Sequence, residues 1–133
     1  MAFVFPPAPI PSIAVAGGED RIPVRPIFCV GRNYAAHARE IGKDPDREPP
    51  FVFTKPADAV VDDGASIAYP PEAENFHYEA ELVVVMGRPG RNVAEADSLS
   101  LVWGYAVGND LTRRRPAAST RRSLTIHDIG SLS

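Results

Sequence analysis

The chain has 133 residues, a size that suits one domain rather than two. Hydrophobic residues make up 44% and charged residues 23%, which is typical of a globular protein and excludes a disordered one. A net charge of −3, without a basic stripe apart from an arginine-rich patch near the end, argues against a nucleic-acid partner.

The chain begins with MAFVFPPAPIPS, which is interrupted by prolines and lacks the basic residues of a signal peptide. No apolar run reaches the ~18 residues that a membrane helix needs, so no membrane partner is expected. The single cysteine, Cys29, excludes an internal disulfide and fits a reducing compartment. It lies in the apolar run IFCV, which favours a buried thiol. The sequence therefore predicts a cytoplasmic protein.

Short β-strands are predicted wherever β-branched or aromatic residues stand beside a turn signal. These segments are Ile27–Val30, Phe51–Thr54, Ala80–Met86 and Trp103–Gly108. The 14 prolines, about twice the average usage, cluster between them and mark loops, because proline cannot donate to a strand ladder. The sequence therefore predicts an α+β, β-rich fold.

Two short helices are also predicted. One spans Tyr34–Ile41, with Asn33 as its N-cap and Gly42 as its stop signal. The other lies around Ala94–Leu101. The segment after Arg115 has no clear period, so no element is predicted there.

The stretch NFHYEAELVVVMG places Glu79 and Glu81 two residues apart at the head of an apolar run. On a strand these residues point to the same face, and their flexible side chains can converge. Converging carboxylates can share a cation, and oxygen ligands favour Mg²⁺, Mn²⁺ or Ca²⁺. Asp110, at the end of WGYAVGND, supplies a third carboxylate. Alternatively, the two glutamates line a solvated sheet face. His77 shares their face, either as a partner of the carboxylates or as a polar sheet residue.

A second polar group lies in GRNYAAHARE. If residues 34–41 are helical, His37 and Glu40 are neighbours on one face. A carboxylate beside an imidazole raises its basicity and fixes its tautomer, which suits a general base acting on water. The alternative is a surface ion pair contributing under ~1 kcal/mol. Lys55 follows a strand, where it either meets an anionic substrate or lies on the surface.

Four segments together resemble the fumarylacetoacetate hydrolase family, in the order and spacing of that family. They are CVGRNYAAHARE, PPFVFTKPADAVV, NFHYEAELVVVMG and VWGYAVGNDLTRR. Within the family the chain is similar to the bacterial fumarylpyruvate hydrolases of gentisate breakdown. The resemblance implies an incomplete mixed β-sandwich roll. Residues 1–21 form an N-terminal extension in this division, and residues 22–114 form the N-terminal part of the catalytic domain.

The resemblance also implies a site. It implies Mg²⁺ or Mn²⁺ bound by Glu79, Glu81 and Asp110, in agreement with the pattern of carboxylates. It further implies that His37 and Glu40 act as a dyad that activates water on a mobile lid.

The function implied is a metal-dependent hydrolase that cleaves the C–C bond of an acylpyruvate, such as fumarylpyruvate, to fumarate and pyruvate. Arg114 matches a substrate-contacting arginine of relatives, and Arg32 and Lys55 are also predicted to bind the diketo acid substrate. Full-length relatives usually pair as homodimers. Two alternatives stay open: an isomerase or decarboxylase of related keto acids on the same fold, and a non-catalytic metal-binding remnant.

The family pattern breaks after Arg114. Relatives continue with a run like R-D-L-Q and then a catalytic lysine, whereas Arg115 stands here where aspartate is expected and Ala117 where glutamine is expected. One inserted C before the codons GAC CTG CAG gives CGA CCT GCA, which encodes Arg-Pro-Ala. We therefore predict that residues 115–133 are an out-of-frame tail, with genuine divergence as the alternative. A poorly stable and weakly active or inactive product is expected.

Overall fold

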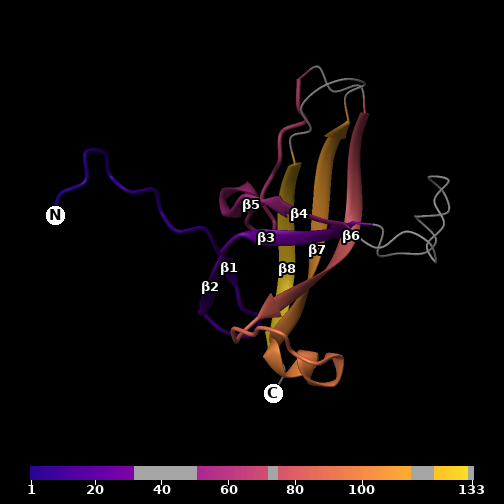
Figure 1. Ribbon diagram of the computed structural model, residues 1–133. Helices are drawn as coiled ribbons and strands as arrows, with labels where there is room; N and C mark the ends of the chain where they lie inside the picture. The colour runs from indigo at the N-terminus through magenta and orange to yellow at the C-terminus, as the bar shows by residue number, and fades with distance from the viewer. Residues whose placement is uncertain (32–50, 72–74, 115–121, 132–133) are drawn as a thin grey trace. The chain divides into compact units, whose positions relative to one another are not determined.

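The computed structural model describes residues 1–31, 51–71, 75–114 and 122–131 (Figure 1). The chain divides into two compact units, one formed by Arg25–Ala57 and the other by Met1–Val24 with Asp58–Ser133. Within the described ranges, no helix combines the length and hydropathy that a membrane crossing requires.

The larger unit is built on a four-stranded sheet in the order β5-β8-β7-β6. Three of its strands are long and lie side by side in Figure 1: β6 (Asn75–Met86), β7 (Val102–Arg114) and β8 (Arg122–Ser131). They pair antiparallel, whereas the two-residue strand β5 (Val60–Val61) pairs parallel with β8. The β6–β7 pair is the most regular part of the fold, with a register shift only between Val85 and Met86.

The two faces of β6 differ in burial, as the period of two in a strand requires. Odd-numbered positions from His77 to Val85 are half-buried, whereas large apolar side chains on the other face are exposed. The exposed set comprises Tyr78, Leu82, Val84 and Met86. On β7 the residues opposite the half-buried face are buried and mostly small, namely Gly104, Ala106, Gly108, Asp110 and Thr112. The face with the odd-numbered β6 residues is therefore the covered face of the sheet.

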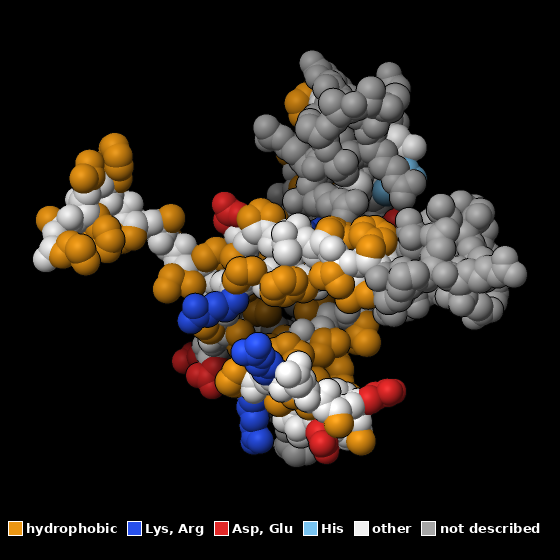
Figure 2. Space-filling view, viewed as in Figure 1, with side chains coloured by type: hydrophobic (Ala, Val, Ile, Leu, Met, Phe, Trp, Pro, Cys, Tyr) orange, Lys and Arg blue, Asp and Glu red, His pale blue; other side chains and the backbone are white. Residues whose placement is uncertain are grey.

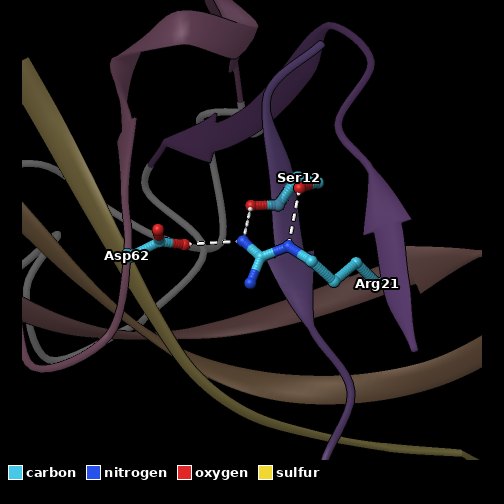
Figure 3. A network of polar contacts seen from close by, with 3 residues as sticks. All are labelled: Ser12, Arg21 and Asp62. Carbon is cyan, nitrogen blue, oxygen red and sulfur yellow. Dashed lines mark hydrogen bonds and ion pairs between the residues drawn. The ribbon is translucent and has the colours of Figure 1, made fainter. Parts of the chain in front are cut away.

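A small hairpin precedes this sheet in the chain. Its strands, β1 (Ser12–Ala14) and β2 (Arg21–Pro23), pair antiparallel around a turn in which Gly17 has a φ of 78°. Arg21 donates hydrogen bonds to the hydroxyl and carbonyl of Ser12, each at 2.8 Å, and forms a 2.7 Å ion pair with Asp62 (Figure 3). Because both ion-pair partners are well exposed, the pair contributes under ~1 kcal/mol to stability.

The first ten residues form an exposed arm before this hairpin. Its large side chains include Phe3 and Phe5, which are 70% and 80% exposed, and Figure 2 shows hydrophobic groups along much of the arm. Because these apolar groups remain in water, the arm adds little to the hydrophobic stabilisation of the unit.

The smaller unit holds a two-stranded antiparallel sheet of β3 (Ile27–Gly31) and β4 (Phe51–Lys55). Phe51 and Phe53 stack with their ring centroids 5.7 Å apart. Cys29, opposite Phe53, is half-buried rather than fully buried as the sequence predicted. At the end of β4, Lys55 is 3% exposed.

All four predicted strands are confirmed as β3, β4, β6 and β7; β3 and β4 are each one residue longer than expected, and β6 and β7 are longer by several residues. β6 begins at Asn75 and β7 continues to Arg114, because the two strands pair along their polar ends. This pairing extends both strands beyond the apolar runs by which they were recognised.

The helix predicted around Ala94–Leu101 is present as a 3₁₀ helix, η2 (Glu95–Leu101). The Ser98 hydroxyl donates to the Glu95 carbonyl at 2.7 Å, and such local bonds compete with a regular α-helix. A second 3₁₀ turn, η1 (Ala57–Ala59), was not predicted. The helix predicted over Tyr34–Ile41 lies outside the described residues.

Candidate functional site

Two of the predicted carboxylates face each other across the β6–β7 pair. Asp110 is the direct register partner of Glu79, and Glu81 is opposite Gly108. Directly opposed residues have Cβ atoms ~4.5–5.5 Å apart and point to the same face. Glu81, two residues beyond Glu79, also points to that face. Strand register thus brings three acidic residues from two strands onto one side of the sheet.

This acidic face is the covered one. Glu79 and Glu81 are half-buried, as are Val83 and Val85 farther along the same side, and Asp110 is only 8% exposed. The glutamates thus lie on the less exposed side of β6, whereas the more exposed side carries large apolar residues. Placing three carboxylates on a covered face carries a desolvation cost, which favours a charged partner there.

The residues beside the carboxylates on β7 are small. Gly108, across from Glu81, has no side chain, and Ala106 is the next residue on the same face. Thr112 is 8% exposed, and its Oγ1 donates to Asp110 Oδ1 at 3.4 Å, which is long for a hydroxyl hydrogen bond. Asp110 thus has a weak orienting contact beside it.

His77 also lies on this face, two residues before Glu79 and directly opposite Thr112. Its Nε2 atom is buried and has no hydrogen-bond partner among the described residues. Nε2 therefore forms no hydrogen bond with Glu79, Glu81 or Asp110.

The three carboxylates share a face, but their side chains are not grouped around one point. Among the described residues, no group of three or more His, Cys, Asp or Glu side chains is arranged to hold a metal ion. None of the three acidic side chains lacks an interaction partner. Like charges on one face repel one another. The donor set itself, three carboxylates, fits a hard divalent ion such as Mg²⁺ or Mn²⁺.

The remaining predicted site residues lie in other parts of the chain. Lys55 belongs to the smaller unit, is 3% exposed and has an interaction partner. Arg114 is the last residue of β7, paired with Asn75. Arg32, His37 and Glu40 lie outside the described residues.

Apart from Asp110, the residues that β7 contributes to the covered face were not predicted from the sequence. In VWGYAVGNDLT, small residues recur at every second position, at Gly104, Ala106 and Gly108, in phase with Asp110 and Thr112. Read with a period of two, that pattern indicates one crowded, covered face ending in polar residues. The signal was present but is weaker than the glutamate pair.

With this geometry described, comparison with known proteins identifies the class. The chain matches the family model described as fumarylacetoacetate (FAA) hydrolase C-terminal over residues 26–130. The chain therefore belongs to the fumarylacetoacetate hydrolase family, as its four sequence segments predicted.

Three curated relatives illustrate the range of activities in the family. The chain is 41% identical over 97 residues to a mitochondrial oxaloacetate tautomerase of Arabidopsis thaliana, covering 73% of this chain and 43% of the relative. It is 48% identical over 71 residues to a fumarylpyruvate hydrolase of Ralstonia sp, covering 53% of this chain and 37% of the relative. It is 46% identical over 88 residues to a homoprotocatechuate catabolism bifunctional isomerase/decarboxylase of Escherichia coli, covering 66% of this chain and 20% of the relative. The chain thus spans less than half the length of each.

Among solved structures, the chain resembles fumarylpyruvate hydrolase from Pseudomonas aeruginosa, whose crystal structure is in complex with Mn²⁺ and pyruvate. The TM-score is 0.86 at 43% identity, over 96% of this chain and 62% of that one. The strand-rich architecture with few helices is therefore that of the family, as predicted.

Proposed function

We propose that this chain is part of a metal-dependent hydrolase that cleaves the C–C bond of an acylpyruvate such as fumarylpyruvate. The observation that carries the proposal is the register that places Asp110 directly across from Glu79, with Glu81 on the same covered face. Similarity to fumarylpyruvate hydrolases from two bacteria supports the choice of substrate class.

In this proposal Glu79, Glu81 and Asp110 hold the divalent cation, Mg²⁺ or Mn²⁺. A cation bound there supplies Lewis-acid polarisation of substrate oxygens and orients the substrate. The three carboxylates fit it by chemistry and by their shared face. The solved relative with Mn²⁺ and pyruvate supports a divalent ion and a keto-acid ligand.

The other proposed roles belong to the remaining site residues that the sequence predicts. His37, oriented by Glu40, takes a proton from the attacking water, and Arg32, Lys55 and Arg114 bind the anionic groups of the diketo acid. Water adds across the cleaved bond, so fumarylpyruvate and one water give fumarate and pyruvate. The buried position of Lys55 supports a role toward an anion rather than toward solvent.

A second candidate is an isomerase or decarboxylase of related keto acids. Relatives named as oxaloacetate tautomerase and as isomerase/decarboxylase match the chain at similar identity. A carboxylate-held cation serves these reactions equally well, because all of them develop negative charge on a keto-acid oxygen. The proposed dyad of His37 and Glu40 favours hydrolysis, since it activates water.

The test is a Mg²⁺- or Mn²⁺-dependent assay with fumarylpyruvate, following loss of substrate and formation of fumarate and pyruvate. The chain is compared with a version whose reading frame is restored after Arg114, and with the Glu79→Gln variant of that version. Turnover in the restored form that Glu79→Gln abolishes is expected. Activity in neither form overturns the hydrolase proposal, and tautomerisation of oxaloacetate without hydrolysis favours the second candidate.

A further inference from the structure

Among the described residues, one buried polar atom on the acidic face has no hydrogen-bond partner. His77 Nε2 is shielded from solvent and forms no hydrogen bond within the described part of the chain. In either tautomer this nitrogen is a hydrogen-bonding group, as donor or as acceptor. Leaving such a group buried and unpaired costs free energy, so an unpaired atom in a folded protein calls for a specific explanation.

The residues closest to His77 by strand register do not supply that partner. Thr112 is directly opposite, but its Oγ1 is directed toward Asp110 Oδ1. Asp110 is the diagonal neighbour of His77, a relationship that separates Cα atoms by ~7–8 Å and still allows a ring to reach the space between. The imidazole therefore borders the region in front of Glu79 and Asp110.

We infer that His77 is a substrate-positioning residue whose Nε2 hydrogen-bonds an oxygen of a small keto acid bound at the acidic face. The inference rests on the proposed function for the cation that draws the keto acid there, but it concerns a different side chain. The carboxylates hold the cation, whereas the imidazole orients the ligand by a directional bond. His77 is not a cation ligand in this arrangement.

The first test separates ligand binding from cation binding in the full chain. Mn²⁺ affinity is measured by titration calorimetry, and pyruvate affinity is then measured on the Mn²⁺-loaded chain. His77→Phe should leave the Mn²⁺ dissociation constant within about twofold of wild type but weaken pyruvate binding by roughly 5–20-fold, the effect of one lost hydrogen bond. His77→Gln, whose amide nitrogen can replace Nε2, should recover most of the pyruvate affinity.

A second readout requires neither activity nor metal. If Nε2 is unpaired in the free chain, His77→Phe removes a buried polar atom and should raise the melting temperature of the metal-free protein by about 2–5 °C. His77→Gln should not, because it keeps a polar group at that position. This gain in stability with a loss of ligand affinity is not expected of a residue with a purely structural role.

The outcomes are distinguishable from failure of the proposed function. If wild type binds Mn²⁺ and pyruvate and His77→Phe binds both equally well, the inference about His77 is wrong while the metal site stands. If His77→Phe loses Mn²⁺ as strongly as Glu79→Gln does, His77 is a metal ligand and the inference is also wrong. If wild type itself binds no Mn²⁺, both the proposed function and the inference are overturned.

Discussion

Replacing Asp110 with asparagine tests the acidic face with little change in shape. Asp110 is 8% exposed, lies directly across from Glu79 and accepts a long hydrogen bond from Thr112. Asparagine keeps the size and one acceptor oxygen but removes the negative charge. If these carboxylates hold a cation together, Asp110→Asn should abolish most of the stabilisation that Mn²⁺ gives to the wild-type chain.

The expected magnitude follows from linkage. At a free Mn²⁺ concentration 100 times the dissociation constant, binding to the folded state adds ~2.7 kcal/mol to the free energy of unfolding. For a chain of this size, each kcal/mol corresponds to about 3–5 °C, so the wild-type melting temperature should rise by about 8–13 °C. If Asp110→Asn weakens binding ~100-fold, the same Mn²⁺ concentration adds only ~0.4 kcal/mol, or about 1–2 °C.

The assay is thermal unfolding followed by circular dichroism, in chelator and then at a fixed excess of Mn²⁺. Asp62→Asn is a matched control, because Asp62 is an acidic residue of the same unit that pairs with Arg21 away from the acidic face. It should lower the melting temperature slightly in both conditions and keep the full Mn²⁺ shift. The reasoning is refuted if Asp110→Asn keeps that shift, or if Asp62→Asn loses it equally.

Two further predictions concern the sheet that presents this face. Ala106 is 3% exposed, so Ala106→Leu should overpack the covered face and lower the free energy of unfolding, measured with denaturant, by ~1–3 kcal/mol. Ala80→Leu, on the exposed side of β6, should change it by no more than ~0.5 kcal/mol. Equal effects of the two substitutions would contradict the assignment of the two faces. At Gly87 an added Cβ would lie 2.8 Å from the Cβ of Trp103, so Gly87→Ala should lower the free energy of unfolding by ~1–3 kcal/mol. Gly18→Ala should not, because its added Cβ would have no atom closer than 3.9 Å. No loss of stability in Gly87→Ala would contradict the close contact with Trp103.

The sequence was sufficient where local pattern determines structure. β3, β4, β6 and β7 each contain a run of β-branched or aromatic residues beside a turn, and all four were predicted. The glutamate pair could be placed on one face because residues two apart on a strand always share a face. The position of Asp110 across from Glu79 could only be hypothesised, because register between strands 31 residues apart in sequence depends on tertiary pairing.

Elements defined mainly by their partners were missed. β5 has two residues and no period of its own, and it exists through its parallel pairing with β8. β8 lies in the segment predicted to be out of frame, yet it pairs with β7 along most of its length, and the family model extends through residue 130. Its stretch Ser123–His127 alternates polar and apolar residues, which is a local signal of a strand. The coding DNA after the Arg114 codon remains the direct test of the reading frame.

The opening of β6 explains why two negative charges precede an apolar run. The same face of this strand carries Glu79 and Glu81 and then Val83 and Val85, and all four are half-buried. Site and packing are thus separated along the axis of the strand rather than between its two faces. Valines at the far end can anchor the strand by apolar burial, while the acidic end presents charges whose repulsion a cation would relieve. This division predicts that truncating Val83 lowers stability with little effect on cation affinity, whereas neutralising Glu79 does the reverse. If one face of the strand packed and the opposite face presented the carboxylates at the same positions, stability and cation affinity could not be changed separately, because every shift in packing would also move the carboxylates.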